Sequence, residues 1–309
     1  MPGARAVVFA YHDVGVRCLK ALLSADVEVP LVVTVADDPH ESRWFASVWD
    51  TATEYGLPVL KPADPNTTEL ARRIAELRPD FIFSFYFRSL LSAGLLQAAS
   101  RGALNMHGSL LPKYRGRAPV NWAILNGEHE TGATLHYMVE RADAGAIVDQ
   151  LAVPILRDDD AYEVFRKVTV AAETILARSL AGLIAGTAPS RPQGIEPGQY
   201  FGRRRPEDGR IDWSRPAQEI HNLVRAVAPP FPGAFTTVNG DRWWLHSTRL
   251  EPVRGEPPPS PRLVAEADRC YIVCRDGAVL HLRAAATAAG PVDLAAAARA
   301  LQGSPAKLE

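Results

Sequence analysis

The 309-residue sequence predicts an α/β fold, a doubly wound, mostly parallel sheet followed by a smaller C-terminal β-barrel of the OB-like type. Through the first half of the chain, short apolar runs alternate with segments of helical periodicity, the pattern of a parallel sheet covered on both faces. A Pro- and Gly-rich stretch at residues 187–209 then interrupts this pattern. Beyond it, short strand-like runs separated by turn signals are typical of a small barrel.

In the first half, the expected strands and helices follow one another in order. Strands are predicted at residues 4–11, 29–35, 57–60, 80–87 and 103–107, and helices at residues 16–25, 42–55, 67–77 and 92–99. A helix at residues 119–126, strands at 133–140 and 146–154, and a long helix at about 161–183 complete this half. Sheets of this kind bind ligands at the carboxyl ends of their strands.

The second half has a different pattern. A short helix is predicted at residues 218–227, and strands are predicted at residues 233–238, 242–246, 262–265, 271–274 and 278–284. We therefore expect a catalytic domain over residues 1–189, a linker over residues 190–209 and a barrel-like domain over residues 210–309.

Composition limits the class of partner. The formal net charge is −1, from 34 basic and 35 acidic residues, which gives no general attraction for nucleic acid or for an anionic membrane. The three cysteines lie in apolar surroundings without the further ligands of a zinc site, so we expect no metal and a reducing compartment. No apolar stretch approaches the length of a membrane span and no signal sequence is recognised, which favours a cytoplasmic location and no membrane partner.

The chemistry-bearing residues gather around the predicted strand at residues 103–107. Asn105 and His107 are two apart, so they point to the same face at the carboxyl end of that strand. A long basic loop, residues 108–119, follows them. An amide that donates to an oxyanion and an imidazole that exchanges protons near neutral pH together suit acyl transfer to an amine. Asp143, in a turn of small residues, is the best carboxylate to orient the histidine.

Each of these residues also has a structural interpretation. A histidine at a strand end is usually a hydrogen-bonded structural residue, and an aspartate before Ala-Gly is usually a turn former. The sequence contains no Gly-x-Ser-x-Gly elbow, Walker A loop or His-Glu-x-x-His helix. The first strand-to-helix turn, residues 11–15, lacks the glycine fingerprint for dinucleotides, so a nicotinamide cofactor is disfavoured.

Taken together, Asn105-x-His107, the Ser109-Leu-Leu-Pro112 loop and Asp143-Ala-Gly resemble the signature of the folate-dependent formyltransferases. The resemblance covers essentially the whole chain. It is strongest to the formyltransferase half of the bifunctional polymyxin-resistance proteins, which formylate UDP-4-amino-4-deoxy-L-arabinose during lipid A modification. Those proteins continue into a dehydrogenase domain, whereas this sequence ends at residue 309, so a separate polypeptide is expected to supply the oxidative step.

The resemblance implies a role for each matching position. It implies a Rossmann-like catalytic domain, Asn105 as oxyanion stabiliser, His107 as proton carrier and Asp143 as the group that raises the pKa of the histidine. The implied donor is 10-formyltetrahydrofolate, without metal or nicotinamide. Folate contacts are expected from Arg117, Val139, Glu140, Arg141, Ala142 and Asp143, and contacts to the sugar nucleotide from Tyr11, Tyr86, Ser109 and Arg204.

Two other functions remain open. Methionyl-tRNA formyltransferases share the motifs, but a tRNA ligand favours a markedly basic surface, and this chain is nearly neutral. A formyltransferase for another nucleotide-linked aminosugar fits the same residues. A non-catalytic folate- or sugar-nucleotide-binding scaffold would not require Asn105, His107 and Asp143 together.

Overall fold

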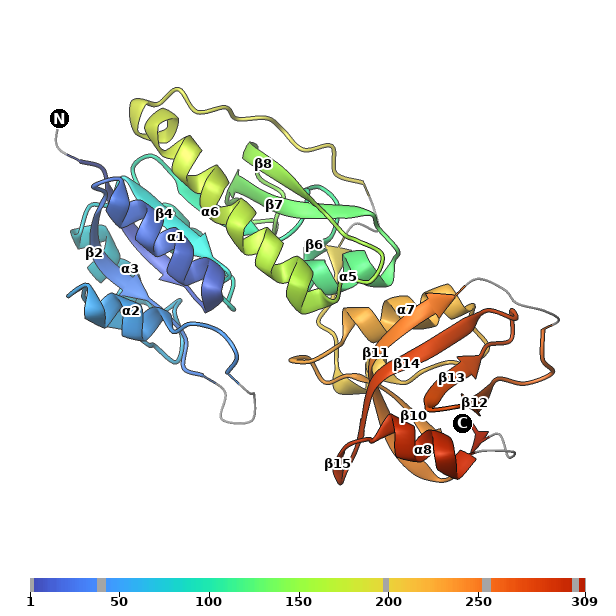
Figure 1. The fold of residues 1–309 in the computed structure, drawn as a ribbon. Helices are drawn as coiled ribbons and strands as arrows, with labels where there is room; N and C mark the ends of the chain where they lie inside the picture. The colour runs from blue at the N-terminus through green and yellow to red at the C-terminus, as the bar shows by residue number, and fades with distance from the viewer. Residues whose placement is uncertain (1–2, 38–42, 197–199, 252–256, 302–305, 309) are drawn as a thin grey trace. The chain divides into compact units, whose positions relative to one another are not determined.

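The computed structural model describes all residues except 1–2, 38–42, 197–199, 252–256, 302–305 and 309. The described chain forms two compact units (Figure 1). The first unit comprises residues 1–119, 130–153 and 166–202, and the second comprises residues 120–129, 154–165 and 203–309. The second unit therefore includes two segments that the sequence-based division assigned to the first domain.

In the described residues of the first unit, a seven-stranded sheet has the strand order β3-β2-β1-β4-β5-β7-β8. Its strands are β1 (Arg5–Ala10), β2 (Glu28–Val33), β3 (Val59–Leu60), β4 (Phe81–Phe85), β5 (Ala103–His107), β7 (Glu130–Tyr137) and β8 (Ile147–Pro154). Strands β3, β2, β1, β4 and β5 pair in parallel, and β7 is antiparallel to β5. The predicted doubly wound, mostly parallel sheet is confirmed. The strand order reverses between β1 and β4, where such folds place a ligand site.

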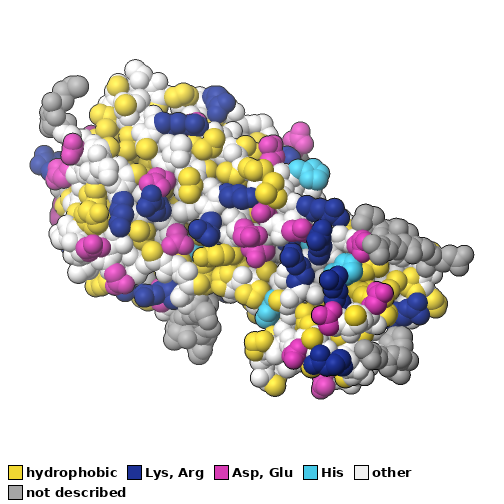
Figure 2. Space-filling view, viewed as in Figure 1, with side chains coloured by type: hydrophobic (Ala, Val, Ile, Leu, Met, Phe, Trp, Pro, Cys, Tyr) yellow, Lys and Arg dark blue, Asp and Glu magenta, His cyan; other side chains and the backbone are white. Residues whose placement is uncertain are grey.

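Helices cover this sheet. They are α1 (His12–Ser24), α2 (Val48–Glu54), α3 (Thr68–Glu76), α4 (Ala93–Leu96) and α6 (Ala161–Ala185). Figure 1 shows α1 and α6 side by side over the sheet, where an ion pair of 2.7 Å joins Arg17 to Glu173. Basic and acidic side chains are intermixed over the face of this unit that Figure 2 shows.

The prediction of a helix over residues 42–55 is wrong at its start, and residue 42 lies outside the described residues. Helix α2 begins at Val48 because the Ser47 hydroxyl caps it by accepting a hydrogen bond from the Asp50 N–H at 3.1 Å. Trp44 and Phe45, which precede the cap, pack instead against the imidazole of His12. Trp44 and Phe45, which the predicted helix included, therefore lie outside it because they pack on a distant residue.

The prediction that no apolar stretch approaches the length of a membrane span is wrong for helix α6. Among the described residues, this helix is long and apolar enough to cross a membrane by length and composition. Its own contacts connect it to β8 and to the segment before β5. The Arg178 guanidinium binds the Asp149 carboxylate on β8 at 2.6 Å, and the Arg101 guanidinium donates to the Leu183 carbonyl at 2.7 Å.

The apolar runs that predicted the strands form the core of the first unit. All five residues of β4 are buried, and the rings of Phe83 and Phe85 stack at 5.5 Å. Phe9 on β1 lies beside Ser84 in the parallel register, and Ser84 lies beside Asn105 on β5. The buried rows of β1 and β4 thus fix β5 in register, so that its carboxyl end carries Asn105 and His107 to one edge of the sheet.

The second unit is built on an antiparallel sheet of order β10-β11-β14-β13-β12-β16, with β15 beside β14. Its strands are β10 (Ala234–Val238), β11 (Asp241–Glu251), β12 (Arg262–Glu266), β13 (Arg269–Val273), β14 (Val279–Thr287), β15 (Gly290–Pro291) and β16 (Ala306–Lys307). The helical segments are α5 (Pro119–Leu125), η1 (Pro206–Gly209), α7 (Ala217–Ala226) and α8 (Leu294–Leu301). The smaller C-terminal barrel-like domain is confirmed as an antiparallel half-barrel. Helix α8 forms in an Ala-rich tail for which no helix was predicted.

The stretch predicted as a linker has ordered partners within the first unit. Strand β9 (Tyr200–Phe201) pairs in parallel with β6 (Arg115–Gly116), which lies in the loop after β5. Arg191 and Ile147 exchange two backbone hydrogen bonds of 2.8 and 2.9 Å. The Pro- and Gly-rich composition therefore indicated an absence of long helices and strands, while the pairing itself depends on residues distant in sequence.

Candidate functional site

The site forms at the carboxyl end of β5. His107 is 6% exposed, and its Nε2 lies 2.8 Å from the Tyr114 carbonyl oxygen. Since a carbonyl can only accept, Nε2 carries a hydrogen and donates it. The other ring nitrogen, Nδ1, faces Asp143 at 3.6 Å. The imidazole is therefore fixed at Nε2, and its Nδ1 is the nitrogen available for proton exchange.

Asp143 lies in the turn between β7 and β8. Its Oδ1 is 3.4 Å from Asn105 Nδ2, and its Oδ2 accepts a hydrogen bond of 2.9 Å from the Gly116 N–H. The structure thus brings together the three residues that the sequence predicted as a catalytic set. Asp143 holds a left-handed backbone with φ of 52°, which aspartate tolerates better than most residues.

The surroundings of Asp143 keep it ionised. Burial alone would raise the pKa of this carboxyl, but the neighbouring His107 and His136 and the Gly116 N–H together hold its pKa well below its usual range. The carboxylate therefore supplies a fixed negative charge at neutral pH, directly beside Nδ1 of His107.

His136 is a site residue that the sequence reasoning missed. It lies on β7 directly across from Asn105, and its Nε2 is 3.2 Å from Asn105 Nδ2 and 3.6 Å from Asp143 Oδ1. Its Nδ1 lies 2.8 Å from the Tyr137 carbonyl oxygen, so Nδ1 carries a hydrogen and Nε2 is placed to accept from the amide. Only the register of β5 against β7 brings this histidine to the site.

The amide of Asn105 directs both of its hydrogens at protein groups. One goes to His136 Nε2 at 3.2 Å and the other to Asp143 Oδ1 at 3.4 Å. The second distance is long for an N–H to oxygen hydrogen bond, so this contact is the weaker of the two. Donation to an oxyanion would most easily replace the contact with Asp143.

The loop after β5 is held by its own polar groups. Ser109 is fully buried, and its hydroxyl donates to the Lys113 carbonyl at 2.6 Å. The Thr134 hydroxyl donates to the Ser109 carbonyl at 2.6 Å, and the Gln150 amide donates to the Leu111 carbonyl at 2.9 Å. The Ser109 side chain thus shapes the loop in this structure, and its contact with a substrate stays a prediction.

Tyr86 follows β4, and its hydroxyl lies against Gly108 in the loop after β5. A Cβ added at Gly108 would overlap the Tyr86 hydroxyl, so the close approach of these residues requires glycine. Burial raises the pKa of this hydroxyl. Tyr86 has a φ of 55° and His12, after β1, has a φ of 68°. Strained backbone of this kind persists only where the surrounding structure enforces it, and it is common at functional sites.

Aromatic side chains surround the turn after β1. The Tyr11 hydroxyl donates to Asp37 Oδ1 at 2.8 Å, and the Arg88 guanidinium lies 4.7 Å from the centre of the Tyr11 ring. His12 stacks on Phe45 with ring centres 3.9 Å apart. Burial and the nearby Arg88 lower the pKa of His12 to about 3, so its ring is neutral at physiological pH. Tyr11 and Tyr86 are thus at the carboxyl ends of β1 and β4, the edge at which β5 carries Asn105 and His107.

The residues predicted to contact folate lie along an exposed segment before Asp143. Val139 is 48% exposed, and Glu140 and Arg141 are also exposed. The Arg115 guanidinium donates to the Ala142 carbonyl at 3.1 and 3.2 Å, which anchors the segment to the loop. Arg117 is exposed and donates to the Arg88 carbonyl at 3.2 Å.

Arg204, predicted to contact the sugar nucleotide, belongs to the second unit. Its guanidinium lies 4.9 Å from the centre of the Trp122 ring and donates to the Asp208 carbonyl at 2.9 Å. Burial lowers its pKa. Its contact with a sugar nucleotide stays a prediction.

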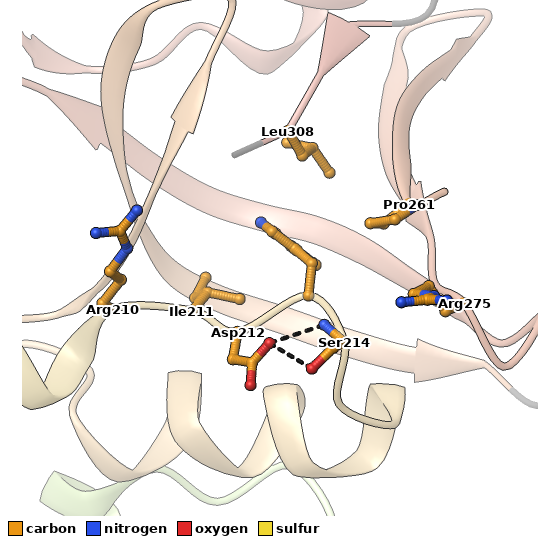
Figure 3. A pocket seen from close by; sticks show the side chains of 8 residues that line it. Arg210, Ile211, Asp212, Ser214, Pro261, Arg275 and Leu308 are labelled. Carbon is orange, nitrogen blue, oxygen red and sulfur yellow. Dashed lines mark hydrogen bonds between the residues drawn. The ribbon is translucent and has the colours of Figure 1, made fainter. Parts of the chain in front are cut away.

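The second unit has a cavity of its own, of about 480 Å³. Figure 3 shows Asp212 bonded to Ser214 at the base of this cavity and Arg210 and Arg275 at its margins. Among the described residues, no group of three or more His, Cys, Asp or Glu side chains could hold a metal ion.

Comparison with known families decides the class of this protein. The description "Formyl transferase" matches residues 5–180, and "Formyl transferase, C-terminal domain" matches residues 204–299. The chain belongs to the formyl transferase family. It is therefore a formyl-transferring enzyme, as the sequence analysis predicted.

Solved structures similar to this formyl transferase share its fold over most of its length. The N-formyltransferase from Helicobacter canadensis, in complex with folinic acid and dTDP-3-aminofucose, has 22% identity and a TM-score of 0.73, covering 91% of this chain and 98% of that chain. The sugar 3N-formyl transferase WlaRD, solved with dTDP and 5-N-formyl-tetrahydrofolate, has 20% identity and a TM-score of 0.68, covering 90% and 97%. Glycinamide ribonucleotide transformylase 1 from Symbiobacterium toebii has 23% identity and a TM-score of 0.53, covering 64% and 92%.

Proposed function

We propose that this enzyme transfers a formyl group from 10-formyltetrahydrofolate to the 4-amine of UDP-4-amino-4-deoxy-L-arabinose. The observation that carries the proposal is the contact of Asn105, His107 and Asp143 at the carboxyl end of β5, in a chain of the formyl transferase family. An amide, an imidazole and an ionised carboxylate are the groups that formyl transfer to an amine requires.

Each residue then has one task. The amine attacks the formyl carbon, and Asn105 Nδ2 donates a hydrogen bond to the oxyanion that develops. His107 Nδ1 accepts the proton that the amine loses and returns it to the departing folate nitrogen. Asp143 Oδ1 lies 3.6 Å from His107 Nδ1, and its negative charge stabilises the imidazole ring while the ring is protonated. His136 Nε2, 3.2 Å from Asn105 Nδ2, holds the amide in place.

The residues beside Asp143 suit a folate. Their exposed segment, residues 139–141, ends next to the carboxylate, so a folate whose pterin is held there would present the formyl group on its N10 near Asn105 and His107. The exposed guanidinium of Arg117 suits the carboxylates of the glutamate tail. Two of the solved structures similar to this chain contain folinic acid or 5-N-formyl-tetrahydrofolate, which supports a folate donor.

The acceptor is the more specific part of the proposal. The arabinose nucleotide is supported by the resemblance of Asn105-x-His107, the loop at residues 108–119 and the turn at residues 141–147, together with a net charge of −1 that disfavours a large polyanion. A second candidate is a dTDP-linked aminohexose. It is favoured by the match to the Helicobacter canadensis enzyme, which extends over 91% of this chain and was solved with dTDP-3-aminofucose.

Parallel assays with different acceptors test which amine the enzyme formylates. Purified enzyme with 10-formyltetrahydrofolate is offered UDP-4-amino-4-deoxy-L-arabinose, dTDP-linked 3- and 4-aminohexoses or initiator methionyl-tRNA, and formylated products are identified by mass spectrometry. We expect the highest kcat/KM with the arabinose nucleotide. Higher efficiency with a dTDP-linked sugar or with tRNA would overturn the acceptor and keep the reaction class. No formylation of any aminosugar nucleotide would overturn the proposed function.

A further inference from the structure

Gln193 holds the turn that carries Asp143. Its side-chain Nε2 donates two hydrogen bonds, to the Asp143 carbonyl at 3.2 Å and to the Gly145 carbonyl at 2.6 Å. Gln193 lies outside the motifs that predicted the site, in the stretch predicted as a linker. The linker stretch therefore reaches the catalytic turn with a side chain as well as with its backbone.

The two hydrogen bonds settle which way the amide points. With its oxygen and nitrogen exchanged, Gln193 would place an acceptor against two carbonyl oxygens, which repel it. In the observed orientation, its Oε1 is buried and accepts no hydrogen bond among the described residues. Burying an unpaired acceptor is unfavourable, so the two donated bonds have to offset that loss.

The turn needs such support because its backbone is strained. Asp143 holds a φ of 52°, and Gly145 packs so closely on the Tyr137 carbonyl oxygen that any added Cβ would overlap it. Within the turn, the Ala144 N–H bonds the Arg141 carbonyl at a long 3.3 Å. A small rotation of this backbone would turn the Asp143 carboxylate away from His107.

Backbone contacts place Gln193 securely. Two residues before it, Arg191 exchanges two backbone hydrogen bonds with Ile147 at the start of β8. Farther along, β9 pairs with β6, and the Gly116 N–H at the end of β6 donates to Asp143 Oδ2 at 2.9 Å. The same chain segment therefore supports the catalytic turn through Gln193 and supports the donor to its carboxylate through β9.

We propose that Gln193 is a positioning residue for formyl transfer. By fixing the carbonyls of Asp143 and Gly145, it sets the direction in which the Asp143 carboxylate meets His107 and Asn105. It contacts no reacting atom and acts through Asp143. This inference rests on the proposed function, because the step that depends on Asp143 is the proton transfer assigned to His107.

The first test separates turnover from binding. Gln193→Ala removes both hydrogen bonds, and Gln193→Glu keeps the shape but sets a carboxylate against two carbonyls. Both variants should lower kcat by about 10-fold or more, since a misplaced catalytic group loses its oriented geometry. The KM for the acceptor and the affinity for 5-formyltetrahydrofolate should change less than about 2-fold. Gln97→Glu, the same replacement at an exposed position of the first unit, is the matched control and should leave kcat unchanged.

The second test asks whether Gln193 acts through Asp143. In an Asp143→Asn background, measured by single turnover, Gln193→Ala should lower the rate by less than about 2-fold, because its route of action is already removed. An unchanged kcat in both Gln193 variants overturns the inference. So does a full further loss in the Asp143→Asn background. Thermal unfolding of each variant identifies any loss that is only a folding defect.

A readout without acceptor keeps this inference distinct from the proposed function. Imidazole NMR signals of His107 and His136 should shift in both Gln193 variants and stay in place in Gln97→Glu, whatever amine the enzyme uses. Unmoved signals would overturn the positioning role. An enzyme that formylates no aminosugar nucleotide but shows these shifts would overturn the proposed function and keep the positioning of Asp143 by Gln193.

Discussion

At the scale of single residues, the geometry of the site divides the work among four polar side chains. His107 is fixed at Nε2 by the Tyr114 carbonyl and faces Asp143 with Nδ1. His136 accepts from the Asn105 amide, which also reaches Asp143. Because these groups contact one another, their substitutions are expected to be non-additive.

Removing the imidazole should stop most proton transfer. We expect His107→Ala to lower kcat by about 100-fold or more, the usual scale for loss of a general acid–base group. Affinity for 5-formyltetrahydrofolate, measured by calorimetric titration, should be retained because the predicted folate contacts lie on residues 139–142 and on Arg117. Turnover close to that of the parent enzyme would show that His107 is structural.

Two substitutions of Asn105 test its role, because they should lower the activity to different extents. Asn105→Ala should lose about 3 kcal/mol of transition-state stabilisation, seen in kcat with little change in KM. Asn105→Asp should be worse, because a carboxylate repels the oxyanion and also lies beside the ionised Asp143. Steady-state kinetics on both variants decide this. If Asn105→Asp is the more active of the two, the amide does not stabilise an oxyanion.

At the scale of elements, the loop after β5 packs closely on the end of β4 because Gly108 has no Cβ. Gly108→Ala would drive a methyl group into the Tyr86 hydroxyl, so we expect a loss of stability of about 1–3 kcal/mol. Tyr86→Phe in the same chain removes the nearest atom and should restore part of that loss. Urea unfolding of both single variants and the double variant measures the coupling. Strict additivity would mean that the two residues do not meet.

Helix α7 carries a buried histidine that links stability to pH. His221 is 0% exposed, with Nδ1 2.8 Å from the Thr248 hydroxyl and Nε2 3.3 Å from the Arg157 carbonyl. Burial, and then the nearby Arg225, lower its pKa to about 4. Since the unfolded value is about 6.5, the stability it contributes is complete above that pH and is lost as pH falls toward 4.

This linkage can be measured. Near pH 5 the unfolded chain binds about one more proton at this position, which gives a slope of about 1.4 kcal/mol per pH unit in the free energy of unfolding. His221→Gln should remove that part of the slope between about pH 4 and 6.5. Urea unfolding across this range is the measurement, and an unchanged slope would contradict the prediction.

At the scale of the whole molecule, the balance of charge bears on the class of acceptor. With 34 basic and 35 acidic residues, the chain should show no saturable binding of initiator tRNA at about 150 mM salt, because phosphate contacts dominate such affinity. Filter binding across a salt series is the measurement. Micromolar tRNA affinity with a steep salt dependence would favour a tRNA substrate over a sugar nucleotide.

Much of this fold could be predicted from the sequence because it rests on local patterns. Apolar runs of strand length located β1, β4 and β5 to within a few residues, and the two-residue spacing of Asn105 and His107 placed both at one strand end. Helix α8 was not predicted, although alanine is the residue that most favours a helix, and in the structure it packs on β12 and β13. The start of α2 was missed because packing on His12 overrode the helical pattern.

By itself, the sequence determined the alternation of strands and helices, the family signature and the three residues Asn105, His107 and Asp143. Only the tertiary structure decided that His136 shares the Asn105 amide and that Gln193 supports the Asp143 turn. The physical reason is distance along the chain. These contacts depend on the register of β5 against β7 and on the path of a segment with little secondary structure, and neither is encoded in the periodicity of any one element.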